Sequence, residues 1–143
     1  MANTKIKSYE SEKEAKVRAE IVELLKSCPI PLDQLMPNLG LFLNSKNLSR
    51  ILFMDHLFKQ IVDVPGVVFE FGTRWGQNVA LFSSLRGIYD PFNRHRKIVG
   101  FDTFAGFAEI SSKDGKSKMM FKGNLTLTKN YYDYLTKIME YHE

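Results

Sequence analysis

The chain has 143 residues, of which 44% are hydrophobic and 25% are charged, as in one ordinary globular domain. No apolar run approaches the roughly 18 residues of a membrane span, and the polar start lacks the apolar region of a signal peptide, so we expect a cytoplasmic protein without a membrane partner. The single cysteine, Cys28, excludes an internal disulfide. The net charge is +4, but the lysines are scattered, so we expect no nucleic-acid partner.

Two amphipathic helices are predicted at the start of the chain, over residues 11–27 and 46–62. Ser11 and Glu14 have the spacing of a capping box, and prolines separate the two helices. We assign residues 1–63 to a helical extension, which acts as a cap over the sheet or cofactor mouth or as a dimer contact. A purely structural role is favoured.

The stretch from Val67 to Asn78 reads as a strand, a tight turn and the start of a helix. Its first five residues are β-branched or aromatic apart from Glu70, and they predict a strand buried on both faces of a parallel sheet. Gly72 and Gly76 follow, and a helix is expected from Gln77 to Arg86 with Gly87 as its stop. The free N–H groups at the helix start would face a ligand.

The glycine spacing excludes two nucleotide-binding motifs. A dinucleotide fingerprint would require glycine at Arg74 and at Gln77, and the residues after Gly76 are not the Gly-Lys-Ser/Thr of a P-loop. The pattern that remains is acid-x-Gly-x-x-x-Gly, beginning at Glu70. On spacing alone, both a ligand-binding turn and an ordinary strand-to-helix turn stay open.

A second apolar strand begins at Lys97 and ends in an acid, Asp102. In a Rossmann-like sheet, the acid at this position accepts both ribose hydroxyls of a nucleotide, since a carboxylate offers two oxygens. A helix N-cap or turn aspartate is the alternative. Between the two strands, the basic run from Arg94 to Lys97 predicts a solvated loop rather than an anion site.

The last stretch, residues 129–142, predicts a helix with Thr128 as N-cap and a broad aromatic face. The face is most simply core, although its tyrosines are also candidates for lining an acceptor pocket.

Taken together, the two strands resemble a specific family. Glu70, Gly72 and Gly76, with the run Gly-Phe-Asp-Thr-Phe-Ala-Gly-Phe at residues 100–107, are similar to the macrocin O-methyltransferase group of class I S-adenosylmethionine-dependent methyltransferases. The second strand of that group reads Gly-Phe-Asp-Ser/Thr-Phe-x-Gly. The resemblance is strong over residues 67–107 and looser over residues 48–62, and it implies an α/β, Rossmann-like fold after the N-terminal helical extension.

The resemblance implies that residues 64–143 are the N-terminal part of a domain that binds S-adenosylmethionine. Glu70 would order the glycine loop and hold the methionine ammonium, backbone N–H groups from Gly72 to Gly76 would approach its carboxylate, and Asp102 would take the ribose hydroxyls. The implied cofactor-binding residues are Glu70, Gly72, Thr73, Gly76, Asn78, Asp102, Thr103 and Phe104.

The implied function is O-methylation of a hydroxyl on a sugar or another small molecule. Only two strands are identified, whereas the family uses about seven, so the chain is expected to be truncated and to need a missing C-terminal segment or a homodimer partner. No catalytic residue and no metal ligand is identified, and the ligands of a family divalent metal would lie outside this chain. The rival interpretation is a half-domain that binds a nucleotide or a partner chain without turnover.

Overall fold

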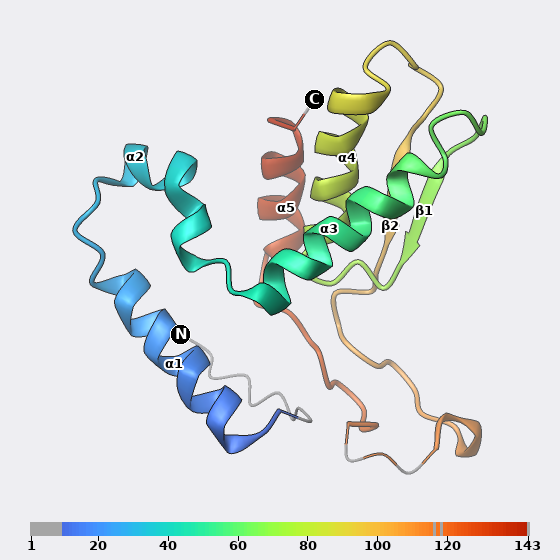
Figure 1. Ribbon diagram of the computed structural model, residues 1–143. Coiled ribbons are helices and arrows are strands. Elements are labelled where there is room, and N and C mark those ends of the chain that lie inside the picture. Colours follow the sequence, from blue (N-terminus) through green and yellow to red (C-terminus); the bar gives the residue numbers. More distant parts are fainter. Residues whose placement is uncertain (1–9, 116, 118, 143) are drawn as a thin grey trace. The chain divides into compact units, whose positions relative to one another are not determined.

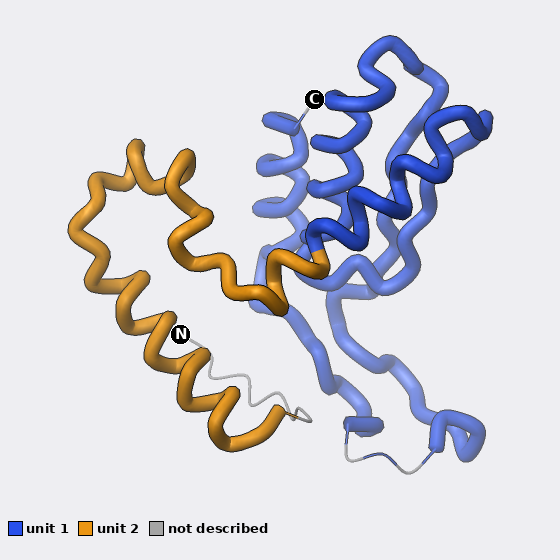
Figure 2. The backbone as a smooth tube through the Cα atoms, viewed as in Figure 1, with its two compact units in different colours: residues 1–7, 51–143 blue, residues 8–50 orange. Residues whose placement is uncertain are grey.

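The computed structural model describes residues 10–115, 117 and 119–142. It divides the chain into two compact units (Figure 2). One unit contains the described residues of Ser8–Arg50, and the other contains the described residues of Ile51–Glu143. No helix in the described residues is long and apolar enough to cross a membrane.

The smaller unit contains α1 (Glu12–Lys26), the short helix α2 (Leu32–Leu35), the 3-10 helix η1 (Met36–Phe42) and the beginning of α3 (Ser45–Lys59). The predicted capping box is confirmed, because the Ser11 side chain accepts the N–H of Glu14 and the Glu14 side chain accepts the N–H of Ser11. This exchange satisfies donors that a helix start otherwise leaves open. Both predicted N-terminal helices are present.

The division between the two compact units falls inside α3, between Arg50 and Ile51. The boundary between residues 63 and 64 stays a prediction from the sequence. The second half of α3 belongs to the larger unit, and its Phe58 is fully buried there against the rings of Phe82 and Tyr89. Asp55 adds a hydrogen bond from the Tyr89 hydroxyl at 2.8 Å. Phe58 of α3 therefore contributes to the core of the larger unit.

The larger unit is built on a strand–helix–strand element (Figure 1). Strand β1 (Val68–Phe71) leads into α4 (Gln77–Tyr89) and then into β2 (Ile98–Phe101), which pairs parallel to β1 with Phe71 opposite Phe101. Both predicted strands are confirmed. The expected stop at Gly87 is wrong, because α4 continues to Tyr89 and ends before Pro91, which cannot continue a helix.

The two faces of the sheet differ. Gly100 faces α4, and a Cβ atom there would collide with the side chains of Thr73 and Val79. On the other face, Phe69, Phe71 and Phe101 contact one another while remaining 55%, 77% and 45% exposed. The expectation of a strand buried on both faces is therefore wrong, since α4 covers only one of them. We call Phe69, Phe71 and Phe101 the aromatic face.

The loop before β2 is anchored by a buried arginine. Arg96 is 2% exposed, and its guanidinium donates to the Asp90 carboxylate and to the carbonyls of Val62 and Val64, at 2.9 and 3.0 Å. The prediction that residues 94–97 form a solvated loop is thus wrong for Arg96, because the charge is paired inside the fold. Arg94 is exposed as expected.

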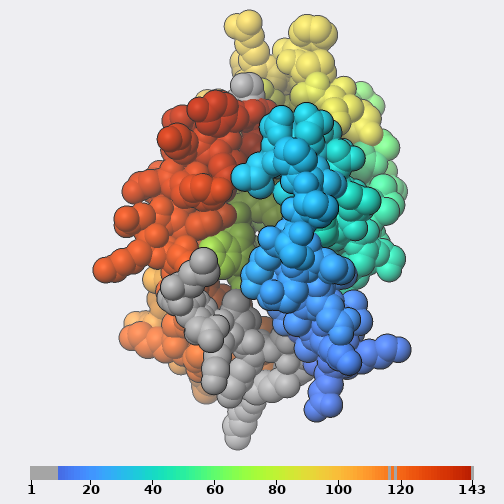
Figure 3. All heavy atoms as spheres, turned by 90° about the vertical axis from the view of Figure 1, so that its left-hand side faces the viewer, coloured from blue at the N-terminus to red at the C-terminus, as the bar shows by residue number. Residues whose placement is uncertain are grey.

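After β2 the chain passes through the 3-10 helix η2 (Ser112–Asp114) and returns as α5 (Tyr131–Met139), beside α4 (Figure 1). Leu135 packs against Gly76, and His142 hydrogen-bonds to Ser84 at 3.1 Å. The helix cap is Asn130 in a left-handed conformation, so the prediction of Thr128 as N-cap is wrong. Part of α5 is surface, as Figure 3 shows in red, and Tyr132 and Tyr134 are about 60% exposed.

Candidate functional site

The turn between β1 and α4 is held by bonds within the chain. Gly72 and Gly76 have φ values of 85° and 78°, which glycine adopts readily. The carbonyl of Phe101 accepts the N–H groups of Gly72 and Thr73 at 2.8 and 3.3 Å, and the carbonyl of Thr73 accepts that of Gly76 at 2.9 Å. These N–H groups already have acceptors, although the sequence assigned them to the ligand carboxylate.

Glu70, in β1, is bonded across the turn to the start of α4. Its Oε1 accepts a hydrogen bond from the side-chain amide of Asn78 at 2.7 Å, which joins the end of β1 to the first turn of α4. This contact agrees with the expected role of Glu70 in holding the glycine loop. It also gives Asn78 a role in bracing the loop.

Asp102 connects the two loops that follow the strands. Its Oδ2 accepts the backbone N–H of Arg74 at 2.7 Å, and its Oδ1 accepts that of Phe104 at 2.6 Å. The second contact is the turn-aspartate geometry that the sequence left open. Each carboxylate oxygen has a second lone pair, so the same side chain keeps acceptor capacity for two hydroxyls.

The loop after Asp102 packs closely on residues 123–127. A Cβ atom at Gly106 would collide with the backbone of Asn124, and the carbonyl of Phe104 accepts the N–H of Leu127 at 3.2 Å. The ring of Phe104 lies edge-on to Tyr132 of α5, with centroids 5.6 Å apart. An aromatic ring beside the carboxylate of Asp102, which is expected to accept ribose hydroxyls, is suited to contact with the nucleobase.

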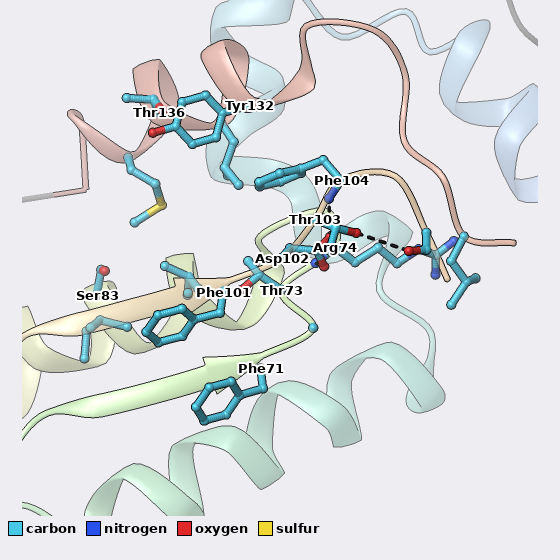
Figure 4. Close-up of a pocket in the computed structure, with 18 of the residues that line it drawn as sticks. Phe71, Thr73, Arg74, Ser83, Phe101, Asp102, Thr103, Phe104, Tyr132 and Thr136 are labelled. Carbon is cyan, nitrogen blue, oxygen red and sulfur yellow. Dashed lines mark hydrogen bonds between the residues drawn. The ribbon is translucent and has the colours of Figure 1, made fainter. Parts of the chain in front are cut away.

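A cavity of about 1060 Å³ opens at the carboxyl ends of β1 and β2 and extends between β2 and α5 (Figure 4). Its size is at the upper end of the usual range for ligand pockets. Five of the predicted cofactor residues line it: Gly72, Thr73, Asp102, Thr103 and Phe104. Glu70, Gly76 and Asn78 do not line it.

Several lining residues were not predicted. Arg74 lines the cavity, although the sequence argument used it only to exclude a dinucleotide fingerprint. On α5, Tyr132, Leu135, Thr136, Met139 and Glu140 line the cavity, and among the tyrosines proposed for an acceptor pocket only Tyr132 is one of them. The helical period of residues 131–139 could have shown that these residues share one face of a helix. It does not show that this face lies against the ends of β1 and β2.

A metal site is not found in the part of the chain that the structure describes. No three His, Cys, Asp or Glu side chains there come close enough to hold a metal ion. The divalent metal implied by the resemblance therefore has no support from these residues.

Comparison with solved structures gives the class of this fold. A crystal structure of the calicheamicin methyltransferase CalS11 matches with a TM-score of 0.90 and 38% sequence identity, covering 94% of this chain and 52% of that chain. An apo structure of CalS11, described there as a TDP-rhamnose 3′-O-methyltransferase of calicheamicin biosynthesis, matches with a TM-score of 0.75 and 36% identity, covering 94% and 50%. The chain matches no protein-family model, and no curated protein sequence matches it.

The fold is therefore α/β and is that of a methyltransferase, as the sequence predicted, and the resemblance to this class is confirmed. The chain spans about half the length of the structures it matches.

Proposed function

We propose that this chain is part of an S-adenosylmethionine-dependent methyltransferase that methylates a sugar hydroxyl. One observation carries the proposal: the chain matches CalS11 at 38% identity over 94% of its length, with Asp102 and the glycine turn together at the mouth of a cavity. The parallel β1–α4–β2 element, with this cavity at its strand ends, supports the Rossmann-like class.

The residues present fit the cofactor in size and chemistry. Asp102 would accept the ribose hydroxyls through its remaining lone pairs, and Phe104, beside Thr103, would contact the adenine. Glu70 and Asn78 would hold the glycine turn in the binding conformation. Bound S-adenosylmethionine would supply an electrophilic methyl group, and the role of these residues is to orient it toward an acceptor hydroxyl.

The acceptor class comes from the comparison. CalS11 is described as a TDP-rhamnose 3′-O-methyltransferase, and a related sugar acceptor is proposed here on that likeness. The general base is not assigned, because none of the lining residues is placed against an acceptor. A divalent metal and a cytoplasmic location stay predictions from the sequence.

The test of this proposal is a calorimetric titration with S-adenosylhomocysteine, with NAD as the control ligand. We expect saturable binding of S-adenosylhomocysteine alone. Asp102→Ala should weaken it by about 1.5 to 3 kcal/mol, the usual value of hydrogen bonds to a charged group. Binding of NAD with equal affinity, or unchanged affinity in a folded Asp102→Ala protein, would contradict the assignment.

A second candidate is a half-domain that binds its ligand or a partner without turnover. It is favoured by the exposed aromatic face, an apolar surface suited to contact with a partner chain. Conversion of S-adenosylmethionine to S-adenosylhomocysteine in the presence of a nucleotide-sugar acceptor separates the two candidates. Binding without conversion would favour the half-domain.

We further propose that the aromatic face is covered either by a second copy of the chain, in a homodimer, or by an additional segment. Three exposed rings side by side form an apolar surface of the kind that marks contact sites. Sedimentation of the wild type and of Phe71→Ser would show whether a second copy covers this surface. A monomer at all concentrations would leave an additional segment as the proposed cover.

A further inference from the structure

We propose that Arg74 is the residue that binds the anionic group of the ligand in this cavity. The ligand class is one that carries a carboxylate or a diphosphate, which are the anionic groups of the cofactor and of a nucleotide-sugar acceptor. The inference rests on the proposed function and assigns to it a binding residue that neither the motif nor the resemblance identified.

Most backbone N–H groups of the turn at residues 72–76 already have acceptors. In residues 72–76, the N–H groups of Gly72, Thr73 and Gly76 bond to carbonyls, and that of Arg74 bonds to Asp102. Trp75 is the one residue of the turn whose N–H has no acceptor among the described residues. A turn with one available donor is a weak site for an anion, so another group is required to hold it.

The lining of the cavity carries charges of both signs. Two carboxylates, Asp102 and Glu140, line it, and they disfavour an anion wherever no cation faces it. Among the described lining residues, Arg74 is the only lysine or arginine. An anionic group of a ligand in this cavity would therefore be placed at Arg74.

The guanidinium of Arg74 has a buried donor and an aromatic neighbour. The Nε of Arg74 is buried, and no described residue accepts a hydrogen bond from it. A buried donor without an acceptor costs free energy, and a planar guanidinium matches two oxygens of a carboxylate or phosphate. The guanidinium carbon lies 5.8 Å from the centre of the Trp75 ring, so an aromatic face supports the cation from one side.

The backbone fixes where this side chain starts. Arg74 has a φ of 50°, in the left-handed region that a non-glycine residue rarely adopts, and its N–H is held by Asp102 at 2.7 Å. Figure 4 shows Arg74 beside Asp102 and Thr103 at the mouth of the cavity. Asp102 therefore positions Arg74 at the strand ends where the Asp102 carboxylate would also bind ribose.

The experiment compares three probes by calorimetry. S-adenosylhomocysteine carries the amino-acid carboxylate. 5′-Methylthioadenosine has the same adenosine and sulfur but lacks the amino-acid end with its carboxylate and ammonium. Thymidine diphosphate carries a diphosphate on a nucleoside and has no carboxylate. The variant Arg74→Asn removes the charge but keeps a residue that tolerates left-handed backbone, and Arg74→Lys keeps the charge without the buried Nε. Arg94→Asn is the matched control, because Arg94 is an exposed arginine outside the cavity.

We expect Arg74→Asn to weaken binding of S-adenosylhomocysteine or of thymidine diphosphate by about tenfold or more, with 5′-methylthioadenosine and the Arg94→Asn protein unchanged. The probe that responds identifies the source of the anion, and Arg74→Lys should recover part of the affinity. Equal weakening of all three probes, or no weakening of either anion, would overturn the proposal while leaving the proposed function intact. If the folded wild type binds neither S-adenosylhomocysteine nor 5′-methylthioadenosine, the proposed function fails, and the titration with thymidine diphosphate alone tests the role of Arg74. If thymidine diphosphate does not bind either, both the proposed function and the proposed role of Arg74 are overturned.

Discussion

The carboxylate of Asp102, at the end of β2, accepts the backbone N–H of Arg74, in the turn after β1, at 2.7 Å. One side chain thus joins the two loops that form the mouth of the cavity. Its other oxygen holds the N–H of Phe104 at 2.6 Å, two residues further along its own loop. Asp102 therefore shapes the site in addition to its proposed contact with ribose.

The double role of Asp102 predicts different effects for two substitutions. Asp102→Ala removes the acceptors of two partly buried N–H groups, and we expect it to lower the free energy of unfolding by about 2 kcal/mol. Asp102→Asn keeps one side-chain oxygen for the turn to Phe104, and we expect about half that loss. Urea unfolding of both variants checks this. Equal stability of Asp102→Ala and wild type would show that the loops do not depend on Asp102.

The buried Arg96 predicts a large loss of stability on truncation. Arg96→Ala leaves the Asp90 carboxylate and two backbone carbonyls without their donor, and we expect a loss of about 3 kcal/mol or more. Arg94→Ala, two residues away and exposed, should change the free energy of unfolding by less than about 0.5 kcal/mol. Thermal unfolding followed by circular dichroism compares the two. Similar losses for both would contradict the structural role of Arg96.

The same ion pair predicts a pH dependence of stability. The hydrogen bond from Arg96 lowers the pKa of Asp90 below its ordinary value of 3.8. Because the folded pKa is the lower one, the pair stabilises the fold above the unfolded value and loses this contribution as the pH falls below about 4. The stability difference between wild type and Asp90→Asn should therefore be largest near neutral pH and shrink toward pH 3. Urea titrations across this range measure it, and a difference independent of pH would refute the assignment.

Two glycines of the same helix region predict opposite effects of alanine. Gly76 has a φ of 78°, and a Cβ atom there would collide with Leu135 of α5, so Gly76→Ala should destabilise by about 2 kcal/mol. Gly87 lies inside α4 with open space at its Cβ position, so Gly87→Ala should stabilise by about 0.5 to 1 kcal/mol. Denaturant midpoints report both changes. A stabilising Gly76→Ala would show that α5 does not pack on the glycine turn.

The strands and helices were largely predictable because their local signals are strong. The β-branched and aromatic runs gave both strands, and the Ser11–Glu14 pair gave the start of α1. One error is local: Gly87 continues the helix, because nothing opposes it until Pro91. Another concerns tertiary contacts: Arg96 is buried because Asp90 and two carbonyls lie within its reach. A charge pattern read along the sequence does not show which arginine has such partners.

The site was predictable where one residue ends a strand and less so where separate segments meet. Gly72 and Asp102 lie at the cavity because parallel strands end at the same edge of a sheet. Tyr132 and Leu135 reach it through α5, about thirty residues later, and no local pattern specifies that packing. Arg74 was missed because its importance comes from its left-handed backbone and from the burial of its Nε, which only the structure provides.

The carboxyl ends of β1 and β2 are the proposed binding site of the adenosyl ligand. The most direct test is a ¹⁵N–¹H correlation spectrum of the labelled chain titrated with S-adenosylhomocysteine. We expect saturable shifts of the amide signals of residues 72–76 and 102–106, with the signals of residues 90–96, before the start of β2, unaffected. Saturable binding without changes in these two segments, or no binding by the folded chain, would contradict it.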